Sequence, residues 1–452
     1  MVGDDHTTLW GLVVALFAVG GWIGASIAPT LADSRGRRAA LAFGAAMFVL
    51  TGITETAAVL IPGAHAPYTD IAAGPTSLLC LGRLASGVGA GIATVAVPML
   101  LGEIAPVSMR GMFGSLAQFA TVLGILGVVS LGYATRDSAL YVVMAGSGVL
   151  GALQLVAAPF LLESPKWLLS ARNDAIAAMH VLEAARGAPE DAVAAELADL
   201  KSEIAEAARV HSKQPTVREL LSSRSYAVVR WPLLAGCVLM IAQQLSGINA
   251  VFFYSGSFLK SAGVNEVAGT LAAASVNVVA TGVGVLLIER AGRRPLLLAA
   301  HLGMIASALV LTGTFMWGKG STAGDDLAIV AIAGFVSFFE IGLGTIPWLI
   351  GSEIFPDKCR ATAMGFAAGI NWTCQIMIAV GFPPLQEAIE GLCFVPFAAV
   401  LTVTLIFCAA FIPETRAKSQ AAIAAEFAER QPTATLACCS SVTHGDTDAL
   451  LA

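Results

Sequence analysis

Long apolar runs separated by short polar loops make up most of this chain. A run of about 20 apolar residues can cross a lipid bilayer, where only helices or closed barrels satisfy their backbone polar groups. The pattern predicts an all-α, polytopic membrane protein with eleven spanning helices. The predicted spans are residues 10–32, 39–61, 77–102, 111–133, 140–162, 230–258, 267–288, 295–317, 327–351, 360–384 and 390–412.

Two polar segments interrupt this pattern. Residues 163–228 are rich in Ala, Glu and Arg at helical spacing, which predicts a small soluble helical insert. The tail after Pro413 begins as a possible short helix and ends in Ser, Thr and Asp, so we expect its last residues to be disordered. The predicted domains are therefore an N-terminal bundle (1–162), the insert (163–228), a C-terminal bundle (229–413) and a tail (414–452).

Composition supports a membrane protein and excludes a nucleic-acid partner. Hydrophobic residues make up 57% of the chain and charged residues 12%, whereas soluble proteins carry about 25% charged residues. The net charge is −6, and no large basic face is available for nucleic acid.

Patterns of catalytic or metal-binding residues are missing from the sequence. The eight cysteines show no regular spacing, the six histidines form no metal-ligand pattern, and no Ser-His-acid set can be assembled. Residues 313–320 imitate a phosphate-binding loop but lack its final Ser or Thr. We therefore expect no enzymatic activity, no cofactor and no metal.

The basic residues predict the orientation of the chain in the membrane. Assigning alternate loops to one side places 21 of the 25 Lys and Arg residues together. Because basic loops favour the cytoplasm, the insert and the C-terminus are predicted to be cytoplasmic and Met1 to lie outside.

An internal repeat divides the chain into two related halves. Asp33–Arg38 matches Glu289–Arg294, and Glu103 with Arg110 matches Glu353 with Arg360. Such parallel repeats predict two pseudo-symmetric bundles. The helix at 230–258 has no partner in the first half, so we expect a twelve-helix design that starts at its second helix. An incomplete gene model or an alternative start is preferred here to a true eleven-helix protein.

Eight short motifs lie in a characteristic order along residues 8–416. They are Gly82-Arg-Leu84, Arg35-Gly-Arg-Arg38, Glu163-Ser-Pro-Lys-Trp167, Gln243-Gln-Leu-Ser-Gly-Ile-Asn249, Glu289-Arg-Ala-Gly-Arg-Arg294, Ile346-Pro-Trp348, Asn371-Trp-Thr373 and Pro413-Glu-Thr415. With them the chain resembles the sugar porter branch of the major facilitator superfamily, most closely the facilitative hexose transporters. The resemblance implies the major facilitator fold, with 11 of its 12 helices present.

Three amides on the sixth apolar run suggest a site for a neutral polyol. Gln243, Gln244 and Asn249 supply donors and acceptors without charge, and a break near Gly247 could bring them toward one cavity. The resemblance assigns all three to sugar hydroxyls. It adds Gln118, Asn277, Glu340, Trp348, Trp372 and Gln375, the last at a position where hexose facilitators often carry Asn.

Each of these residues also has a purely structural interpretation. Membrane amides such as Gln118 and Asn277 often hydrogen-bond neighbouring helices. Glu340 is an acid in an apolar run, and such acids face a cavity or a basic partner. Trp348 could pack against other side chains or anchor the membrane interface.

A second set of residues puts both charge signs at the same ends of both bundles. The resemblance implies that they form a salt-bridge network that closes the inner side in the outward-facing state; the alternative is that the arginines only set the topology. The set comprises Asp33, Arg37, Arg38, Glu103, Arg110, Glu163, Glu289, Arg293, Arg294, Glu353, Arg360 and Glu414.

Several positions depart from the family pattern, and they bear on gating rate and sugar preference. Ser34 replaces a basic residue, Leu343 and Thr345 replace two prolines, and Ala417 replaces a glycine.

The predicted function is hexose transport by alternating access, facilitative, in the plasma membrane, with a sugar and the lipid bilayer as partners. The alternatives are a proton-coupled sugar or polyol symporter and a truncated, non-transporting sugar sensor. The resemblance places the acid that separates symporters from facilitators on the first helix of the family, which we expect to be missing from this sequence.

Overall fold

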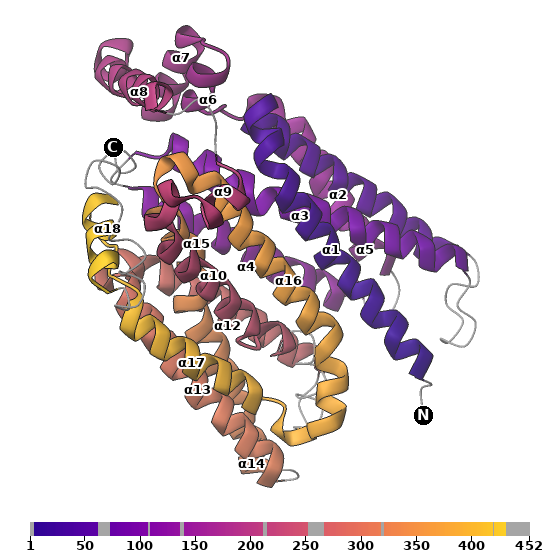
Figure 1. Ribbon diagram of the computed structural model, residues 1–452. Helices are drawn as coiled ribbons and strands as arrows, with labels where there is room; N and C mark the ends of the chain where they lie inside the picture. Colours follow the sequence, from indigo (N-terminus) through magenta and orange to yellow (C-terminus); the bar gives the residue numbers. More distant parts are fainter. Residues whose placement is uncertain are drawn as a thin grey trace. The chain divides into compact units, whose positions relative to one another are not determined.

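The chain is all-helical in the part that the structure describes (Figure 1). The computed structural model describes residues 4–61, 73–106, 109–135, 140–210, 215–251, 266–317, 321–418 and 420–430. Ten of its helices are long and apolar enough to cross a membrane, and the pair Pro384–Leu392 and Val395–Phe411, bent by 84°, makes up to eleven. The predicted all-α, polytopic fold is confirmed. The tail residues predicted to be disordered lie outside the described residues from 431 onward.

The described residues divide into two compact units. Unit 1 covers 1–114 and 134–214, and unit 2 covers 115–133 and 215–452. The helices of unit 1 are α1 (Asp4–Arg35), α2 (Arg37–Leu60), α3 (Ala73–Ile104), α5 (Leu140–Ala157), η2 (Ala158–Phe160), α6 (Pro165–Ala171), α7 (Ala175–Arg186) and α8 (Glu190–Val210). Those of unit 2 are most of α4 (Arg110–Thr135), α9 (Val217–Ser222), η3 (Arg224–Val229), α10 (Arg230–Leu245), α12 (Glu266–Ala291), α13 (Arg293–Trp317), α14 (Thr322–Phe339), η4 (Glu340–Gly344), α15 (Ile346–Ile354), α16 (Asp357–Ile389), η5 (Glu390–Leu392), α17 (Val395–Phe411) and α18 (Gln420–Glu429).

The described part of the polar insert is helical, and three of its helices, α6, α7 and α9, begin with side-chain caps. The Ser164 side chain accepts from the Trp167 N–H at the start of α6, and Asp174 does the same for α7. Thr216 and Glu219 form a reciprocal capping box on α9. Such caps supply partners for N–H groups that a short helix leaves unpaired.

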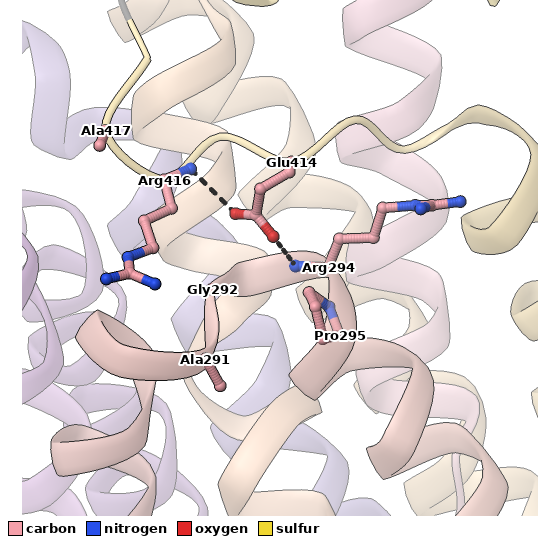
Figure 2. A pocket seen from close by; sticks show the side chains of 7 residues that line it. All are labelled: Ala291, Gly292, Arg294, Pro295, Glu414, Arg416 and Ala417. Atoms are coloured by element: carbon pink, nitrogen blue, oxygen red, sulfur yellow. Dashed lines mark hydrogen bonds between the residues drawn. The ribbon is translucent and has the colours of Figure 1, made fainter.

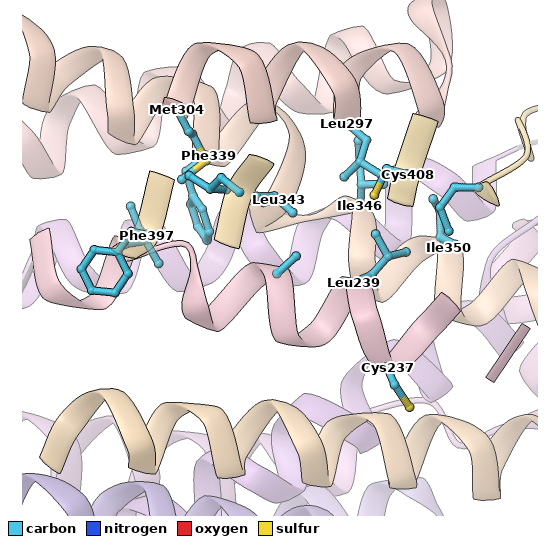
Figure 3. Close-up of a cluster of buried hydrophobic side chains, with 14 of the residues drawn as sticks. Cys237, Leu239, Leu297, Met304, Phe339, Leu343, Ile346, Ile350, Phe397 and Cys408 are labelled. Atoms are coloured by element: carbon cyan, nitrogen blue, oxygen red, sulfur yellow. The ribbon is translucent and has the colours of Figure 1, made fainter. Parts of the chain in front are cut away.

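The core of unit 2 is a continuous cluster of buried apolar side chains from several helices. Figure 3 shows Leu239 of α10, Leu297 and Met304 of α13, Leu343 of η4 and Phe397 of α17 within it. This packing holds the two irregular segments described next.

The predicted break in the sixth apolar run lies at Gly247. α10 ends at Leu245, and the helical hydrogen bonding resumes with the Val251 N–H donating to the Gly247 carbonyl at 3.0 Å. Gly247 has φ 94°, and a Cβ there would lie 2.6 Å from Cδ2 of Phe397. Glycine therefore fits this bend both in conformation and in space.

A π-helical turn, η4, separates α14 from α15 within the ninth apolar run. It is followed by Pro347, which has no N–H to donate to the carbonyl of Leu343 four residues earlier. The run thus contains a carbonyl that needs a partner from another helix.

Candidate functional site

All nine residues predicted to bind sugar lie in unit 2. One group is centred on Glu340, which begins η4 and is 2% exposed. Its Oε2 accepts from Gln118 Nε2 at 3.0 Å and from Thr281 Oγ1 at 3.1 Å. The carboxyl group is thus held by two neutral donors from α4 and α12, and no ion pair to Glu340 occurs among the described residues.

Asn277 lies one helical turn before Thr281 on α12 and is 1% exposed. The Thr281 hydroxyl has one hydrogen, which it shares between Glu340 and the Asn277 backbone carbonyl 2.8 Å away, so Asn277 and Glu340 have a common neighbour. Neither Oδ1 nor Nδ2 of Asn277 has a hydrogen-bond partner among the described residues. Because buried amides are nearly always paired, this side chain is a candidate for ligand binding.

A second group joins amides of α10 and α16 around Asn371. Gln243 Nε2 donates to the carbonyls of Leu343 and Gly344, and Asn371 Nδ2 donates to Gln243 Oε1 at 2.8 Å. Gln244 Nε2 donates to Asn371 Oδ1 at 2.9 Å. Asn249 Nδ2 completes the group by donating to Gln244 Oε1 at 2.5 Å.

The two groups both adjoin η4. The Gly344 carbonyl accepts from Gln243, and a Cβ on Gly344 would lie 2.6 Å from Glu340 Oε2. The structure therefore brings together Gln118, Glu340, Gln243, Gln244 and Asn249 around one irregular turn.

The remaining predicted residues lie on α15 and α16 beside these groups. Trp348 is half-buried on α15 just after η4, and Trp372 is buried next to Asn371. Gln375 lies one turn further along α16, half-buried, with no hydrogen bond to other described residues.

Sequence reasoning missed two residues of this site. Asn371 enters the sequence prediction only as part of a motif, although an amide in an apolar run beside Trp372 already indicates a polar environment. Thr281 is four residues after Asn277, which places both on one helix face.

The predicted network forms ion pairs inside unit 1. Arg37 binds Glu103 with two hydrogen bonds of 2.9 Å, and its Nη1 donates to Asp33 at 3.2 Å. Glu163 accepts from the backbone N–H groups of Arg37 and Arg38 rather than from their side chains. This carboxylate therefore caps the N-terminus of α2.

Unit 2 repeats the same arrangement. Arg293 donates to Glu353 at 2.9 Å and to Glu289 at 3.3 Å. Glu414 accepts from the backbone N–H groups of Arg293 and Arg294, both at 3.0 Å, so it caps α13. The side chain of Arg110 lies outside the described side chains, and Arg360 Nε donates to the Phe355 carbonyl at 3.2 Å.

The cap by Glu414 shows the electrostatics of this end of unit 2. Burial alone raises the pKa of the Glu414 carboxyl, but backbone N–H groups of Arg416, Arg293, Arg294 and Thr415 outweigh it and hold the pKa below its usual value. Figure 2 shows this carboxylate between the Arg416 and Arg294 N–H groups.

A cavity of about 440 Å³ surrounds this cap. It is lined by Ala291, Gly292, Arg294, Pro295, Glu414, Arg416 and Ala417. None of the residues lining it belongs to the predicted sugar site. We place the functional site at η4, because the buried unpaired amide and the convergent neutral donors are there.

No group of three or more His, Cys, Asp or Glu side chains that could hold a metal occurs among the described residues. The groups at η4 are instead amides, a hydroxyl and one carboxyl group. Together they offer donors and acceptors with little charge, which suits a neutral ligand with several hydroxyl groups.

Comparison with known proteins gives a consistent result. The family described as "Sugar (and other) transporter" matches residues 2–427. The chain is 39% identical over 425 residues to solute carrier family 2, facilitated glucose transporter member 4 of Mus musculus, covering 93% of this chain and 80% of that protein. It is 36% identical over 417 residues to member 3 of Rattus norvegicus, covering 91% and 81%.

Solved structures show the same fold. The major facilitator superfamily proton:xylose symporter XylE bound to 6-bromo-6-deoxy-D-glucose matches with a TM-score of 0.77 at 23% identity, covering 94% of this chain and 90% of that one. The partially occluded inward open conformation of XylE from E. coli matches with a TM-score of 0.73 at 22% identity, covering 91% of each chain. The predicted major facilitator fold is confirmed.

Proposed function

Because the chain belongs to the sugar transporter family, we propose that it carries a hexose of the glucose type across a membrane by alternating access, down the sugar gradient. The observation that carries this proposal is the buried amide of Asn277, which has no hydrogen-bond partner among the described residues and lies beside the Glu340 group. Relatives named as facilitated glucose transporters support the choice of substrate. We also propose that the chain is a transporter and not an enzyme.

The proposed location is the plasma membrane, with the insert and the C-terminus in the cytoplasm. The uneven distribution of basic residues supports this orientation. The charged network would then lie on the cytoplasmic side.

Uptake of labelled glucose into vesicles that contain the purified chain tests the function. We expect net uptake to stop when the glucose concentration is equal on both sides of the membrane. Imposing a proton gradient should not change the uptake. Gln243→Ala and Gln244→Ala should each weaken sugar binding without lowering the amount of folded protein. Unchanged affinity in both variants would contradict the site.

A proton-coupled sugar or polyol symporter is the second candidate. It is favoured by Glu55, an acid of the apolar helix α2 that is 6% exposed and lies 3.5 Å from Arg83 of α3. Acids inside membrane helices often belong to proton pathways. Glucose accumulation above equilibrium, driven by an inward proton gradient and lost in Glu55→Gln, would favour this candidate.

A further inference from the structure

We propose that Asn371 is a positioning residue that determines which atoms of the sugar-binding amides donate and which accept. The inference rests on the proposed sugar site at η4. Asn371 is 3% exposed on α16 and hydrogen-bonds both Gln243 and Gln244.

The series of hydrogen bonds starts at backbone carbonyls, which can only accept. Pro347 leaves the Leu343 carbonyl without a helical donor, and Gln243 Nε2 donates to it at 2.8 Å and to the Gly344 carbonyl at 2.9 Å. Both hydrogens of the Gln243 amide are thereby used, so its Oε1 is an acceptor. Turning this amide over would place its oxygen against two other oxygens.

Asn371 transmits this direction to the next amide. Its Nδ2 donates to Gln243 Oε1 at 2.8 Å and to the Met240 carbonyl at 3.3 Å, so its Oδ1 is an acceptor. Gln244 must therefore direct Nε2 toward Asn371, which it does at 2.9 Å. The orientation of Gln244 thus follows from a backbone carbonyl on another helix.

The last member of the series is Asn249, beyond the Gly247 bend. Because Gln244 directs its Nε2 toward Asn371, its Oε1 remains as the acceptor on the other side, and Asn249 donates to it through Nδ2. Asn249 is half-buried, and its Oδ1 has no partner among the described residues. The site is thereby left with an acceptor to which a sugar hydroxyl can donate.

Two series of glucose analogues, deoxy and fluorodeoxy at each hydroxyl, test this inference in competition with labelled glucose. A fluorine cannot donate, so at a hydroxyl that faces a protein acceptor both analogues should lose affinity equally. We expect at least one such hydroxyl in the wild-type protein. In Asn371→Ala, the side-chain amides of Gln244 and Asn249 can rotate by 180° together, so that an N–H faces the sugar instead of an oxygen. At that hydroxyl position the fluoro analogue should then bind about fivefold more tightly than the deoxy analogue.

Two further variants separate positioning from simple damage. Pro347→Ala supplies a backbone N–H that can donate to the Leu343 carbonyl, which weakens the hydrogen bond from Gln243 to that carbonyl. It should shift the fluoro-to-deoxy affinity ratio in the same direction as Asn371→Ala, but by less. Thr404→Val removes a buried 3.1 Å hydrogen bond to His301 elsewhere in unit 2 and should keep the wild-type ratios.

The outcomes distinguish this inference from the proposed function. Glucose binding by the wild type together with unshifted fluoro-to-deoxy ratios in Asn371→Ala and Pro347→Ala overturns the role of Asn371 alone. No sugar binding by the wild type overturns both. If Asn371→Ala does not fold, the ratios in Pro347→Ala decide by the same criterion.

Discussion

Asn277 is almost completely buried, and neither of its side-chain polar atoms has a hydrogen-bond partner among the described residues. Leaving a buried amide without partners costs about 1–3 kcal/mol. A membrane helix that carries such an amide for structural reasons would pair it with a neighbouring helix, as Gln243 and Asn371 are paired. The unpaired state therefore favours a ligand-binding role.

Replacing this amide by an apolar side chain of similar size separates stability from binding. In Asn277→Leu, we expect the free energy of unfolding to rise by about 1 kcal/mol, because no buried polar group is left unpaired. Glucose affinity should fall about tenfold through the lost contact. Thermal unfolding in detergent with and without glucose measures both, and Thr312→Val on α13 serves as the control. A destabilised variant with normal affinity would show that the amide is structural.

The sequence indicates which residue types the candidate site contains, but it does not indicate which of them hydrogen-bond to one another. Gln118 and Glu340 could be named from the sequence, but their hydrogen bond joins helices more than 200 positions apart in the chain. At Ala417, by contrast, the sequence pattern does indicate a feature of the local backbone. The resemblance implies glycine at this position, and the structure gives Ala417 φ 55°, a conformation that costs an L-residue about 1–2 kcal/mol.

At the scale of helices, α2 and α3 pack closely where Gly82 faces Glu55. A Cβ on Gly82 would lie 2.5 Å from Cγ of Glu55, so the absent side chain lets Glu55 approach Arg83. The Glu55 side chain is 7% exposed and that of Arg83 is 38% exposed. This ion pair is therefore only partly shielded from its surroundings.

Removing one partner should destabilise this helix pair more than removing both. Glu55→Met should lower the free energy of unfolding by about 1–2 kcal/mol, below the 3–5 kcal/mol of a fully buried pair because Arg83 is partly exposed. Replacing both residues by Met should recover most of the loss. Unfolding of the single and double variants gives the coupling energy, and strictly additive losses would mean that the two charges do not interact.

The spanning helices could be predicted because their length and apolar character follow directly from bilayer thickness. The Gly247 bend could also be predicted, since a glycine follows the amide pair. The π-helical turn η4 could not be predicted, because it depends on a contact between helices: Pro347 has no N–H for the Leu343 carbonyl, and Gln243 of another helix donates to it instead. The extension of α16 to Ile389, beyond the predicted end at 384, was likewise not visible in the apolar pattern.

At the scale of the whole chain, the sequence repeat reappears as a repeat of contacts. Gly36 and Gly292 both have positive φ, and each precedes a helix capped by a distant glutamate. Arg37 and Arg293 each donate to the last backbone carbonyls of the preceding helix and to an acid of another helix. The same motif thus ties together the helix ends within each unit.

If these two clusters hold the proposed inner gate closed, weakening either should favour the inward-open state. Glu103→Gln and Glu353→Gln each remove the charge of an arginine's acceptor, a change of about 1–3 kcal/mol because the arginines are largely buried. Because the two clusters lie in different units and share no partner among the described residues, the shifts should add within about 0.5 kcal/mol in the double variant. Distances between spin labels at the exposed residues Ser202 and Ser222 report the populations, with Glu190→Gln as the control. A full shift from one variant alone, or distances that do not change in the double variant, would assign the arginines to topology rather than to gating.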